Sequence, residues 1–498
     1  MKHTWSYCRK KYPNHNIVAY FFNARGSELE KSPLGMLRSV LYQLLDQDQL
    51  LCERFMPRFL DKRGKHGEKW EWHPGELREF LRLEMKHRQS KPVIILIDAL
   101  DECNDRDVKD VVSFLELLSI DAFNSTISLH IGLSSRHYPN IDMKKRLELK
   151  IDEEEGHHKD IAVYISDKLI VKNKKIEKEL IRKADHVFMW VVLVVVMLNQ
   201  AFYNGDVRAM EDKLRELPSD LDEVFSNILG KDVPDKKKTI LMLQWVLFTK
   251  RLLKPEELYF AVLAGAATDR LGAWDRSFET EETIQRYITS TSKGLIEVRK
   301  GDTTTVQFIH ESVNDFLVRH RRLQTLDPIL EQHPIGSSHE TLAACCLSYI
   351  MIDELEPVET SVEDRKKAGK NLDFKYPFLN YACTSLLKHI EQAQKDGIAQ
   401  HALLRRLEQP SKEFNRLTAF HDIFQGDAEN RCVRSAELLY TVSLYSYYNL
   451  AQLLLERGAD VNAQGGYYGS ALQQAARREG NEATVQLLLK HGACKIEQ

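Results

Sequence analysis

The chain has 498 residues, of which 43% are hydrophobic and 29% are charged, a composition typical of a globular protein with several domains. Its formal net charge of −3 gives no overall attraction to nucleic acid or to an acidic membrane surface. The eight cysteines form no CxxC pair, which favours reduced thiols and a cytoplasmic location.

The longest apolar run, "VFMWVVLVVVML" at 187–198, is shorter than the roughly 20 residues of a membrane-spanning helix. We therefore expect a buried helix there and no membrane insertion. The first fifteen residues also lack the apolar core of a secretory signal.

Strand and helix patterns alternate over the first 150 residues, which is typical of a parallel sheet with helices on both faces. The predicted strands are 16–26, 93–97 and 127–137, and a further short strand is predicted at 146–151. The predicted helices are 32–47, with Ser32 as N-cap and Pro33 in the first turn, 74–88 and 106–121.

The remaining two thirds of the chain are mainly helical in pattern. A helical region runs to about 230, and the block 236–322 has three helical patterns followed by "GLIEVRKGDTTTVQFIH", which predicts a β-hairpin and suggests a winged helix. Residues 324–440 are again helical. Near the end, "LLLERGADVNA" at 453–463 recurs as "LLLKHGACKIE" at 487–497, a shift of 34 residues that resembles ankyrin repeats.

The stretch "PVIILIDALDECND" places acidic residues directly after a buried strand. Asp98 ends that strand, and ligands of open parallel sheets bind at the carboxyl ends of strands. A carboxylate there can hold Mg²⁺ against nucleotide phosphates, and Asp101 and Glu102 could orient an attacking water. An acidic turn after a buried strand also arises for purely structural reasons.

Arg136 ends the next strand along the chain, 38 residues after Asp98. The helix predicted at 106–121 can join the two strands as parallel neighbours, so that Arg136 projects over the same sheet edge. A guanidinium at that position can stabilise phosphate charge.

These motifs together resemble the NACHT-type signalling ATPases of the STAND class, in the form common in fungi with a nephrocystin-like sheet domain. "DALDEC" is similar to that family's Walker B motif, and "LSSR" to its sensor strand, with serine and His137 in place of the usual threonine and proline. "FFNARG", "FMWVVLVVVML", "LPSDLDEVFSNIL" and "VQFIHESVNDFL" extend the resemblance, and ankyrin repeats are a frequent sensor array in such proteins.

The resemblance implies a role for each matching residue. Asp98 would bind Mg²⁺, Asp101 and Glu102 would support hydrolysis, and Arg136 would sense the γ-phosphate of ATP. His310, in "FIHES", would hold the ADP-bound closed state, although a histidine beside a hairpin is often a structural residue.

A Walker A loop, G-x-x-x-x-G-K-[S/T], is absent from these 498 residues, and "GKHGEK" at 64–69 has the wrong spacing. We expect the chain to begin within the helix that follows this loop in the family, and its repeat array to lack a terminal cap. Loss of the loop is expected to weaken ATP or ADP binding by several kcal/mol, at about 1.5–3 kcal/mol per charge-assisted hydrogen bond. A strand would be lost with the loop, which would leave unpaired sheet edges.

The sequence thus predicts a protein of mixed α/β and α class. Its domains are expected to be an incomplete P-loop-NTPase sheet domain at 1–151, a helical domain at 152–235, a winged helix at 236–323, a helical linker at 324–435 and ankyrin repeats at 436–498.

Two functions remain open on the sequence. The first is a nucleotide-switched signal-transduction protein whose hydrolysis is defective and whose ankyrin tail binds protein ligands, with oligomerisation implied by the resemblance. The second is a non-enzymatic scaffold with a vestigial NTPase domain. DNA binding through the winged helix is disfavoured because residues 279–293 carry three glutamates, and no zinc-ligand spacing is found.

Overall fold

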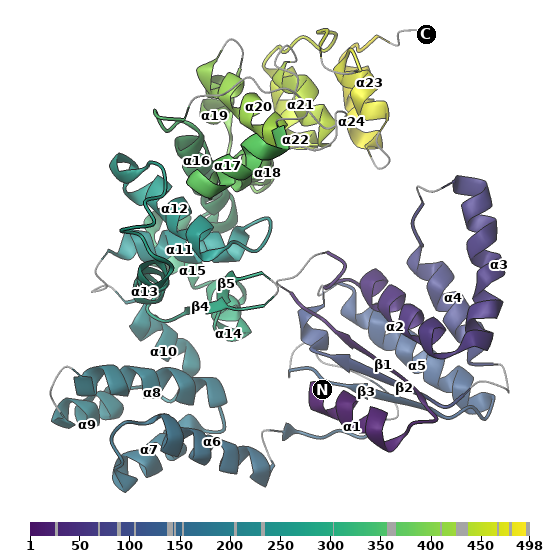
Figure 1. The fold of residues 1–498 in the computed structure, drawn as a ribbon, viewed down its shortest axis with the longest axis vertical. Helices are drawn as coiled ribbons and strands as arrows, with labels where there is room; N and C mark the ends of the chain where they lie inside the picture. The colour runs from purple at the N-terminus through teal and green to yellow at the C-terminus, as the bar shows by residue number, and fades with distance from the viewer. Residues whose placement is uncertain are drawn as a thin grey trace. The chain divides into compact units, whose positions relative to one another are not determined.

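The computed structural model describes residues 1–498 except 25–27, 68–69, 87–90, 104–105, 137–142, 144–145, 152–153, 204–206, 231–234, 302, 356–364, 409–410, 425–436, 466–467, 478–480 and 495–498. The chain divides into two compact units, Met1–Leu149 and Lys150–Gln498. Each unit is described by itself (Figure 1).

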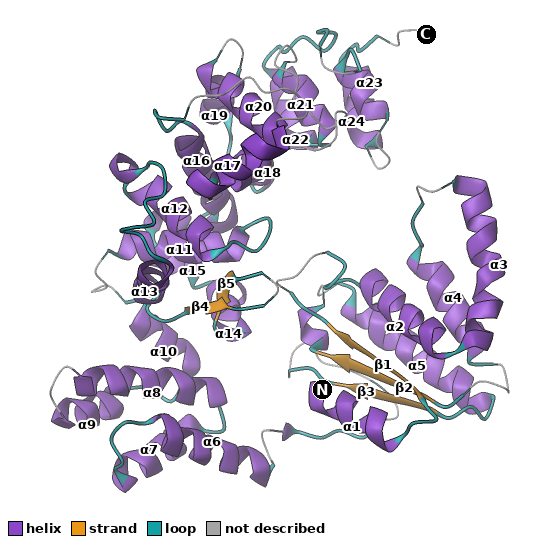
Figure 2. Ribbon diagram, viewed as in Figure 1, coloured by secondary structure: helices purple, strands orange, loops and turns teal. Residues whose placement is uncertain are grey.

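The first unit is an α/β unit. Its elements are α1 (Lys2–Lys11), β1 (Asn16–Phe21), α2 (Pro33–Gln47), α3 (Gln49–His66), α4 (Pro74–Glu84), β2 (Val93–Asp98), a 3-10 turn (Leu100–Glu102), α5 (Val108–Asn124) and β3 (Leu129–Leu133). The strands form a parallel sheet in the order β1-β2-β3 (Figure 2). Phe21 lies opposite Asp98, and Ile97 lies opposite Leu133. The predicted parallel sheet is therefore confirmed.

The two faces of this sheet are buried by different helices. Alternate residues of β2, among them Ile95 and Ile97, pack with α2, α4 and α5 in the larger core. Ile94 and Leu96 point to the other face, where Trp5 of α1 packs against them. Period-two alternation of apolar side chains on both faces is what a parallel sheet covered on both sides requires.

Side chains from α2 bind the outer edge of β1. Gln43 Oε1 accepts from the Ala19 N–H at 3.0 Å, and its Nε2 donates to the Ala19 carbonyl at 2.9 Å. Gln47 makes the same pair of hydrogen bonds with Ile17, at 2.9 and 3.1 Å. Gln43 and Gln47 are one helical turn apart, so they match alternate residues of the strand. The sequence analysis expected unpaired sheet edges. At the β1 edge this is not what the structure shows, because the two side-chain amides pair with the N–H and carbonyl groups of Ile17 and Ala19.

The helix starting after Ser32 is confirmed, since the Ser32 side chain accepts from the Gly35 N–H and Pro33 opens α2. The strand predicted at 146–151 is wrong. Residues 146–150 form no strand, and Leu147 is fully exposed. No strand in the described part of the chain pairs with this segment, so its alternating pattern has no sheet to join.

The second unit, where the structure describes it, is helical apart from one hairpin. Its elements are α6 (Glu155–Lys168), α7 (Lys174–Ala184), α8 (Phe188–Tyr203), α9 (Val207–Glu216), α10 (Leu221–Ile228), α11 (Lys236–Phe248), α12 (Pro255–Ala266), α13 (Glu281–Thr291), β4 (Ile296–Arg299), β5 (Thr305–Phe308), α14 (Glu311–Asn314), α15 (Leu323–Leu326), α16 (Pro334–Ile350), α17 (Arg365–Lys375), α18 (Leu379–Lys395), α19 (His401–Leu407), α20 (Lys412–Phe424), α21 (Leu438–Leu444), α22 (Tyr448–Glu456), α23 (Ala471–Ala476) and α24 (Glu482–Lys490).

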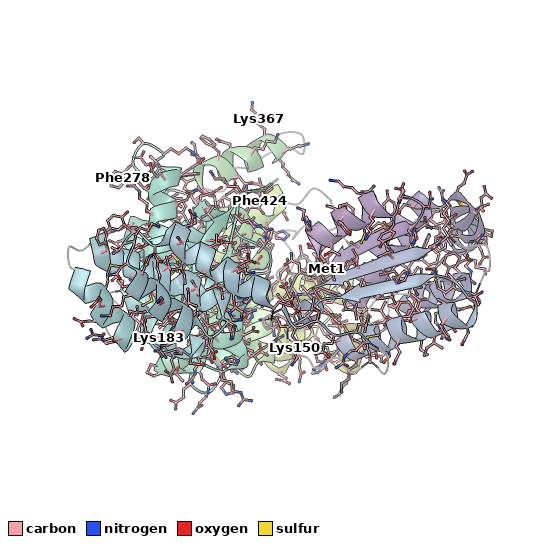
Figure 3. All side chains as sticks on the ribbon, turned by 90° about the horizontal axis from the view of Figure 1, so that it is seen from below. Met1, Lys150, Lys183, Phe278, Lys367 and Phe424 are labelled. Atoms are coloured by element: carbon pink, nitrogen blue, oxygen red, sulfur yellow. The ribbon has the colours of Figure 1, made fainter. Side chains whose placement is uncertain are left out.

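The predicted buried helix is α8, in which Trp190, Val194 and Leu198 are fully buried. Among the described helices, none combines the length and apolar character that crossing a bilayer requires. Lys183 of α7, labelled in Figure 3, links α7 to the end of α9. Its Nζ donates to the carbonyls of Leu214 and Leu217, each at 2.7 Å.

The predicted hairpin is confirmed as the antiparallel pair β4 and β5, which follows three helices, α11 to α13. At the end of the chain, two helix pairs repeat. Each second helix, α22 and α24, is followed by a glycine with φ of +89°, Gly458 and Gly492, a backbone conformation that suits residues without a side chain. The repeated 34-residue pattern of the sequence therefore corresponds to a repeated structural unit.

Candidate functional site

The candidate site lies at the carboxyl ends of β2 and β3. The register of these strands brings Ser134, just beyond β3, beside Asp98: the Ser134 hydroxyl donates to Asp98 Oδ1, and the Ser134 N–H donates to the Ile97 carbonyl at 2.9 Å. Asp98 is half-buried, and its Oδ2 has no hydrogen-bond partner in the described residues. The structure therefore leaves one carboxylate oxygen of Asp98 available at the sheet edge.

The backbone turns sharply after Asp98. Ala99 has φ of +52° and ψ of +49°, in the left-handed region, at a cost of about 1 kcal/mol for a residue with a Cβ atom. The Leu100 N–H then donates to the Ser134 carbonyl at 3.0 Å. This turn brings Asp101 back beneath the end of β3, and strained residues of this kind are concentrated at functional sites.

Asp101 and Arg136 form an ion pair. Asp101 is 4% exposed, and both of its oxygens accept hydrogen bonds from Arg136: Oδ1 from the backbone N–H at 3.1 Å and Oδ2 from Nε at 2.6 Å. The structure thus brings together two residues that the sequence analysis assigned to different roles. The carboxylate of Asp101 is occupied by the arginine.

Glu102 contacts the loop that follows β1. Its Oε2 accepts from the Ala24 N–H at 3.0 Å. Arg25 and Gly26 of "FFNARG", Asn104 and Asp105 after the acidic turn, and His137 lie outside the described residues.

His310 belongs to the second unit and caps a short helix. Its Nδ1 accepts from the Ser312 N–H at 3.1 Å and lies 2.9 Å from the Ser312 hydroxyl, so the ring is the N-cap of α14. This local contact accounts for the histidine structurally. Because the two units are described separately, His310 is not placed relative to Asp98.

Ser134, whose hydroxyl donates to Asp98, was not identified as a candidate by the sequence analysis. The signal that could have found it is its position in "LSSR", two residues before Arg136, since alternate residues of an extended segment point to the same side. The neighbouring Ser135 hydroxyl is buried and has no hydrogen-bond partner among the described residues.

The donor set fits a Mg²⁺ ion that is held together with phosphates. Asp98 supplies one open oxygen, and Mg²⁺ in nucleotide sites commonly takes one or two carboxylates with waters and phosphates. In the described residues no group of three or more His, Cys, Asp or Glu side chains is arranged to hold a metal ion by itself.

Two comparisons with known proteins found a match, and one of them covers the part of the chain that carries this sheet edge. Residues 1–136 match the family model described as Nephrocystin 3, N-terminal. This nephrocystin-like region contains all three strands and ends at Arg136, so it includes Asp98, Asp101 and Glu102. The chain is also 27% identical over 307 residues to a curated protein named "Azaphilone pigments biosynthesis cluster protein L" from Monascus ruber. That alignment covers 56% of this chain and 61% of the relative.

The ion pair in the nephrocystin-like region gives a direct prediction. Arg136→Ala leaves the buried Asp101 carboxylate without its guanidinium partner, and we expect the free energy of unfolding of the first unit to fall by about 2 kcal/mol, reduced from the value for a fully buried pair because Arg136 is 36% exposed. Urea denaturation followed by circular dichroism measures the change.

The matched control is the double variant Asp101→Asn/Arg136→Ala, which removes the uncompensated charge and should recover part of the loss. Unchanged stability of Arg136→Ala would show that the pair does not hold this edge together.

Proposed function

We propose that the chain is a STAND-class signal-transduction protein whose NACHT-type domain retains a nucleotide-responsive sheet edge but does not hydrolyse ATP efficiently. The observation that carries this proposal is the arrangement at the ends of β2 and β3, where Asp98 has an open oxygen and Arg136 lies on the adjacent strand end. The match of residues 1–136 to the nephrocystin model supports it.

Within this proposal, Asp98 would hold Mg²⁺ bound to ATP or ADP, with Ser134 orienting the carboxylate through its hydroxyl. Bound Mg²⁺ would supply neutralisation of phosphate charge. Arg136 would sense the γ-phosphate only by exchanging its contact with Asp101 for one with the nucleotide. Such an exchange would be a local change of charge contacts, which is how ligand-dependent switches generally act.

Defective hydrolysis follows from two features. These 498 residues contain no glycine loop that could surround the phosphates, and Asp101, expected to assist hydrolysis, has both oxygens engaged by Arg136. Glu102, the second acid, has one oxygen on the Ala24 N–H. Positioning of water and phosphate is the main source of catalysis in phosphoryl transfer, and a glycine loop would supply much of that positioning.

The second unit would transmit and receive the signal. The three helices and hairpin at 236–308 have the element order of a winged helix, and His310 directly follows the hairpin. The two helix pairs at 438–490 have the period and glycine positions of ankyrin repeats, and we propose that they bind a protein ligand.

A non-enzymatic scaffold is the second candidate. It is favoured by the use of the motif residues within the chain itself: Asp101 binds Arg136, Glu102 binds Ala24 and His310 caps α14. In that case the sheet edge would be a structural remnant.

The experiment is nucleotide binding by the purified 498-residue chain. We expect Mg²⁺-dependent ADP binding in calorimetry, and we expect Asp98→Ala to weaken it about tenfold, the value of one charge-assisted contact. Because hydrolysis is proposed to be defective, the wild-type chain should release phosphate from ATP no faster than the Asp98→Ala variant does. Asp110→Ala, which removes an exposed acid of α5, is the matched control and should bind ADP normally. A folded chain that binds no ADP, or binds it equally after Asp98→Ala, would support the scaffold instead.

A further inference from the structure

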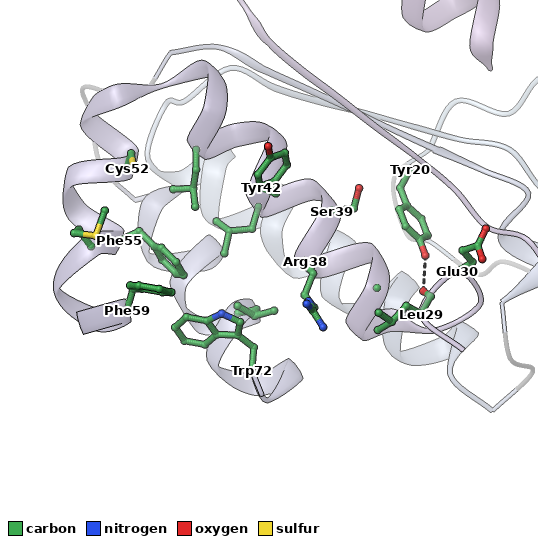
Figure 4. Close-up of a pocket in the computed structure, with 15 residues that line it drawn as sticks. Tyr20, Leu29, Glu30, Arg38, Ser39, Tyr42, Cys52, Phe55, Phe59 and Trp72 are labelled. Atoms are coloured by element: carbon green, nitrogen blue, oxygen red, sulfur yellow. Dashed lines mark hydrogen bonds between the residues drawn. The ribbon is translucent and has the colours of Figure 1, made fainter. Parts of the chain in front are cut away.

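A large apolar groove lies between α2 and α3, and its lining includes none of Asp98, Asp101, Glu102 and Arg136. Its volume is about 620 Å³, within the range of small-molecule pockets. Figure 4 shows the side chains of α2, α3 and the segments before α2 and α4 that surround it. The α2–α3 groove is lined by Tyr20, Leu29, Glu30, Gly35, Arg38, Ser39, Leu41, Tyr42, Leu45, Cys52, Phe55, Met56, Phe59, Trp72 and Leu77.

One wall of the groove is aromatic. The rings of Phe55 and Trp72 are 5.1 Å apart between centroids, and Phe59 lies beside them in the view of Figure 4. At the rim, Tyr42 is 71% exposed and Met56 is 43% exposed. Large apolar side chains left open around a concave surface are typical of a binding site rather than of a closed core.

Among the described residues that line the groove, one is a cation, the exposed Arg38. Arg38 projects from α2 into the space between Trp72 and Leu29 (Figure 4). In the described part of the chain no carboxylate forms an ion pair with Arg38, and the one acid in the lining, Glu30, accepts a hydrogen bond from Asn23 at 3.4 Å. A guanidinium on an apolar wall is a specific partner for a carboxylate, because it offers a planar pair of donors.

We propose that the α2–α3 groove binds an amphiphilic anion, an apolar chain or ring system that carries one carboxylate. Its apolar body would cover the aromatic wall formed by Phe55, Phe59 and Trp72, and its carboxylate would pair with Arg38. The ligand class follows from charge complementarity at Arg38, since the groove presents much apolar surface and a guanidinium that has no ion-pair partner among the described residues, whereas the Glu30 carboxylate accepts a hydrogen bond from Asn23. This site does not depend on nucleotide binding at the strand ends.

The test uses the whole chain and a thiol inside the groove. Cys52 lines the groove and is partly exposed, whereas Cys494 is exposed in the second unit. Alkylation of each thiol by N-ethylmaleimide is followed by peptide mass spectrometry, with decanoate as the probe and decyltrimethylammonium as an amphiphile of equal tail and opposite charge, both below their micelle concentrations. We expect decanoate to slow alkylation of Cys52 in a saturable manner, to leave Cys494 unaffected, and to protect much better than the ammonium compound.

Variants separate the role of Arg38 from general hydrophobic binding. Arg38→Met should raise the decanoate concentration needed for protection about tenfold, the value of one charge-assisted contact. Arg299→Met, which removes an exposed arginine of β4, should leave it unchanged.

Three outcomes would overturn the proposal. Equal protection of Cys52 by the cationic amphiphile would show that the groove does not select anions, as expected of a groove that binds an apolar helix of another protein. Full protection in Arg38→Met would remove the assigned partner. Alkylation of Cys52 that slows with rising protein concentration in the absence of decanoate would show that a second copy of the chain covers the groove.

Discussion

The double variant Gln43→Leu/Gln47→Leu is expected to lower the free energy of unfolding of the first unit by about 3 kcal/mol, because it removes four hydrogen bonds to the edge of β1. Leucine keeps the volume and the helix propensity of glutamine but can neither donate nor accept. The N–H and carbonyl groups of Ile17 and Ala19 would then face the edge without partners. Urea denaturation measures the loss of stability.

The same variant should aggregate more readily, because an unsatisfied strand edge is a template for pairing with another chain. Light scattering at rising protein concentration measures this. Gln43→Glu should fall between the wild type and Gln43→Leu, since a carboxylate can accept from the Ala19 N–H but cannot donate to its carbonyl.

Gln49→Leu is the matched control, because Gln49 is exposed and its side-chain bond is made within α3, to Glu53. Equal stability of the control and the double variant would contradict a role for the two amides at the sheet edge.

The second large effect is expected from a buried histidine pair in the second unit. His339 of α16 and His389 of α18 share a hydrogen bond of 2.8 Å between their Nδ1 atoms, and His389 Nε2 lies 2.9 Å from the Tyr381 hydroxyl. One Nδ1 must donate to the other, so the bond fails when both rings are protonated. Burial, with Lys250 as the second cause, lowers the pKa of His339 from 6.5 to about 3. Burial also holds the pKa of His389 well below 6.5.

The direction of the pH dependence follows from these pKa values. Both folded-state pKa values are depressed, so the unfolded chain binds more protons below pH 6.5, and the stability contributed by the neutral rings is lost as the pH falls from about 6.5 toward the folded values. Each histidine contributes a slope of up to about 1.4 kcal/mol per pH unit in this window. We therefore expect the free energy of unfolding of the second unit to fall by about 2 kcal/mol between pH 6.5 and pH 5.5.

Urea denaturation at several pH values, followed by tryptophan fluorescence, measures this slope, since Trp245 packs edge-on against His389. The variant His339→Gln/His389→Gln should be less stable at pH 7.5 but should lose much of the slope. His491→Gln, which removes an exposed histidine, should keep it. An unchanged slope in the double variant would assign the pH dependence to other groups.

Elements whose signals lie within a few residues of one another, such as a helix cap or a hairpin, were predicted correctly. A strand that needs a neighbouring strand from elsewhere in the chain was not always predicted correctly. α2 begins after Ser32 because the cap and Pro33 act within one turn of the chain. The hairpin of β4 and β5 likewise follows from two short alternating runs. The segment 146–151 has the same alternation, but a strand needs a neighbour and none is present among the described strands. The helix α3 (Gln49–His66), one wall of the groove, was not predicted.

The candidate site shows the same division. Asp98 and Arg136 were expected at one sheet edge because parallel strands joined by a helix place their carboxyl ends together. The contact between Asp101 and Arg136 was not expected, because it depends on the left-handed turn at Ala99 and on the depth of the carboxylate beneath β3. Nothing in the one-dimensional pattern distinguishes an acid that faces a ligand from one that faces its neighbour.

The sequence by itself determined the three parallel strands, the helix that begins after Ser32, the hairpin, the position of the acidic turn and the terminal repeat, since each of these depends on periodicity or on residues close together in the chain. Only the tertiary structure decided how the polar side chains are used: Gln43 and Gln47 close the edge of β1, Asp101 holds Arg136, and Arg38 is left without a described carboxylate partner in an apolar groove. The reason is physical, because the partner of a polar group is chosen by three-dimensional distance and burial, and the residues concerned are up to 35 positions apart in the chain.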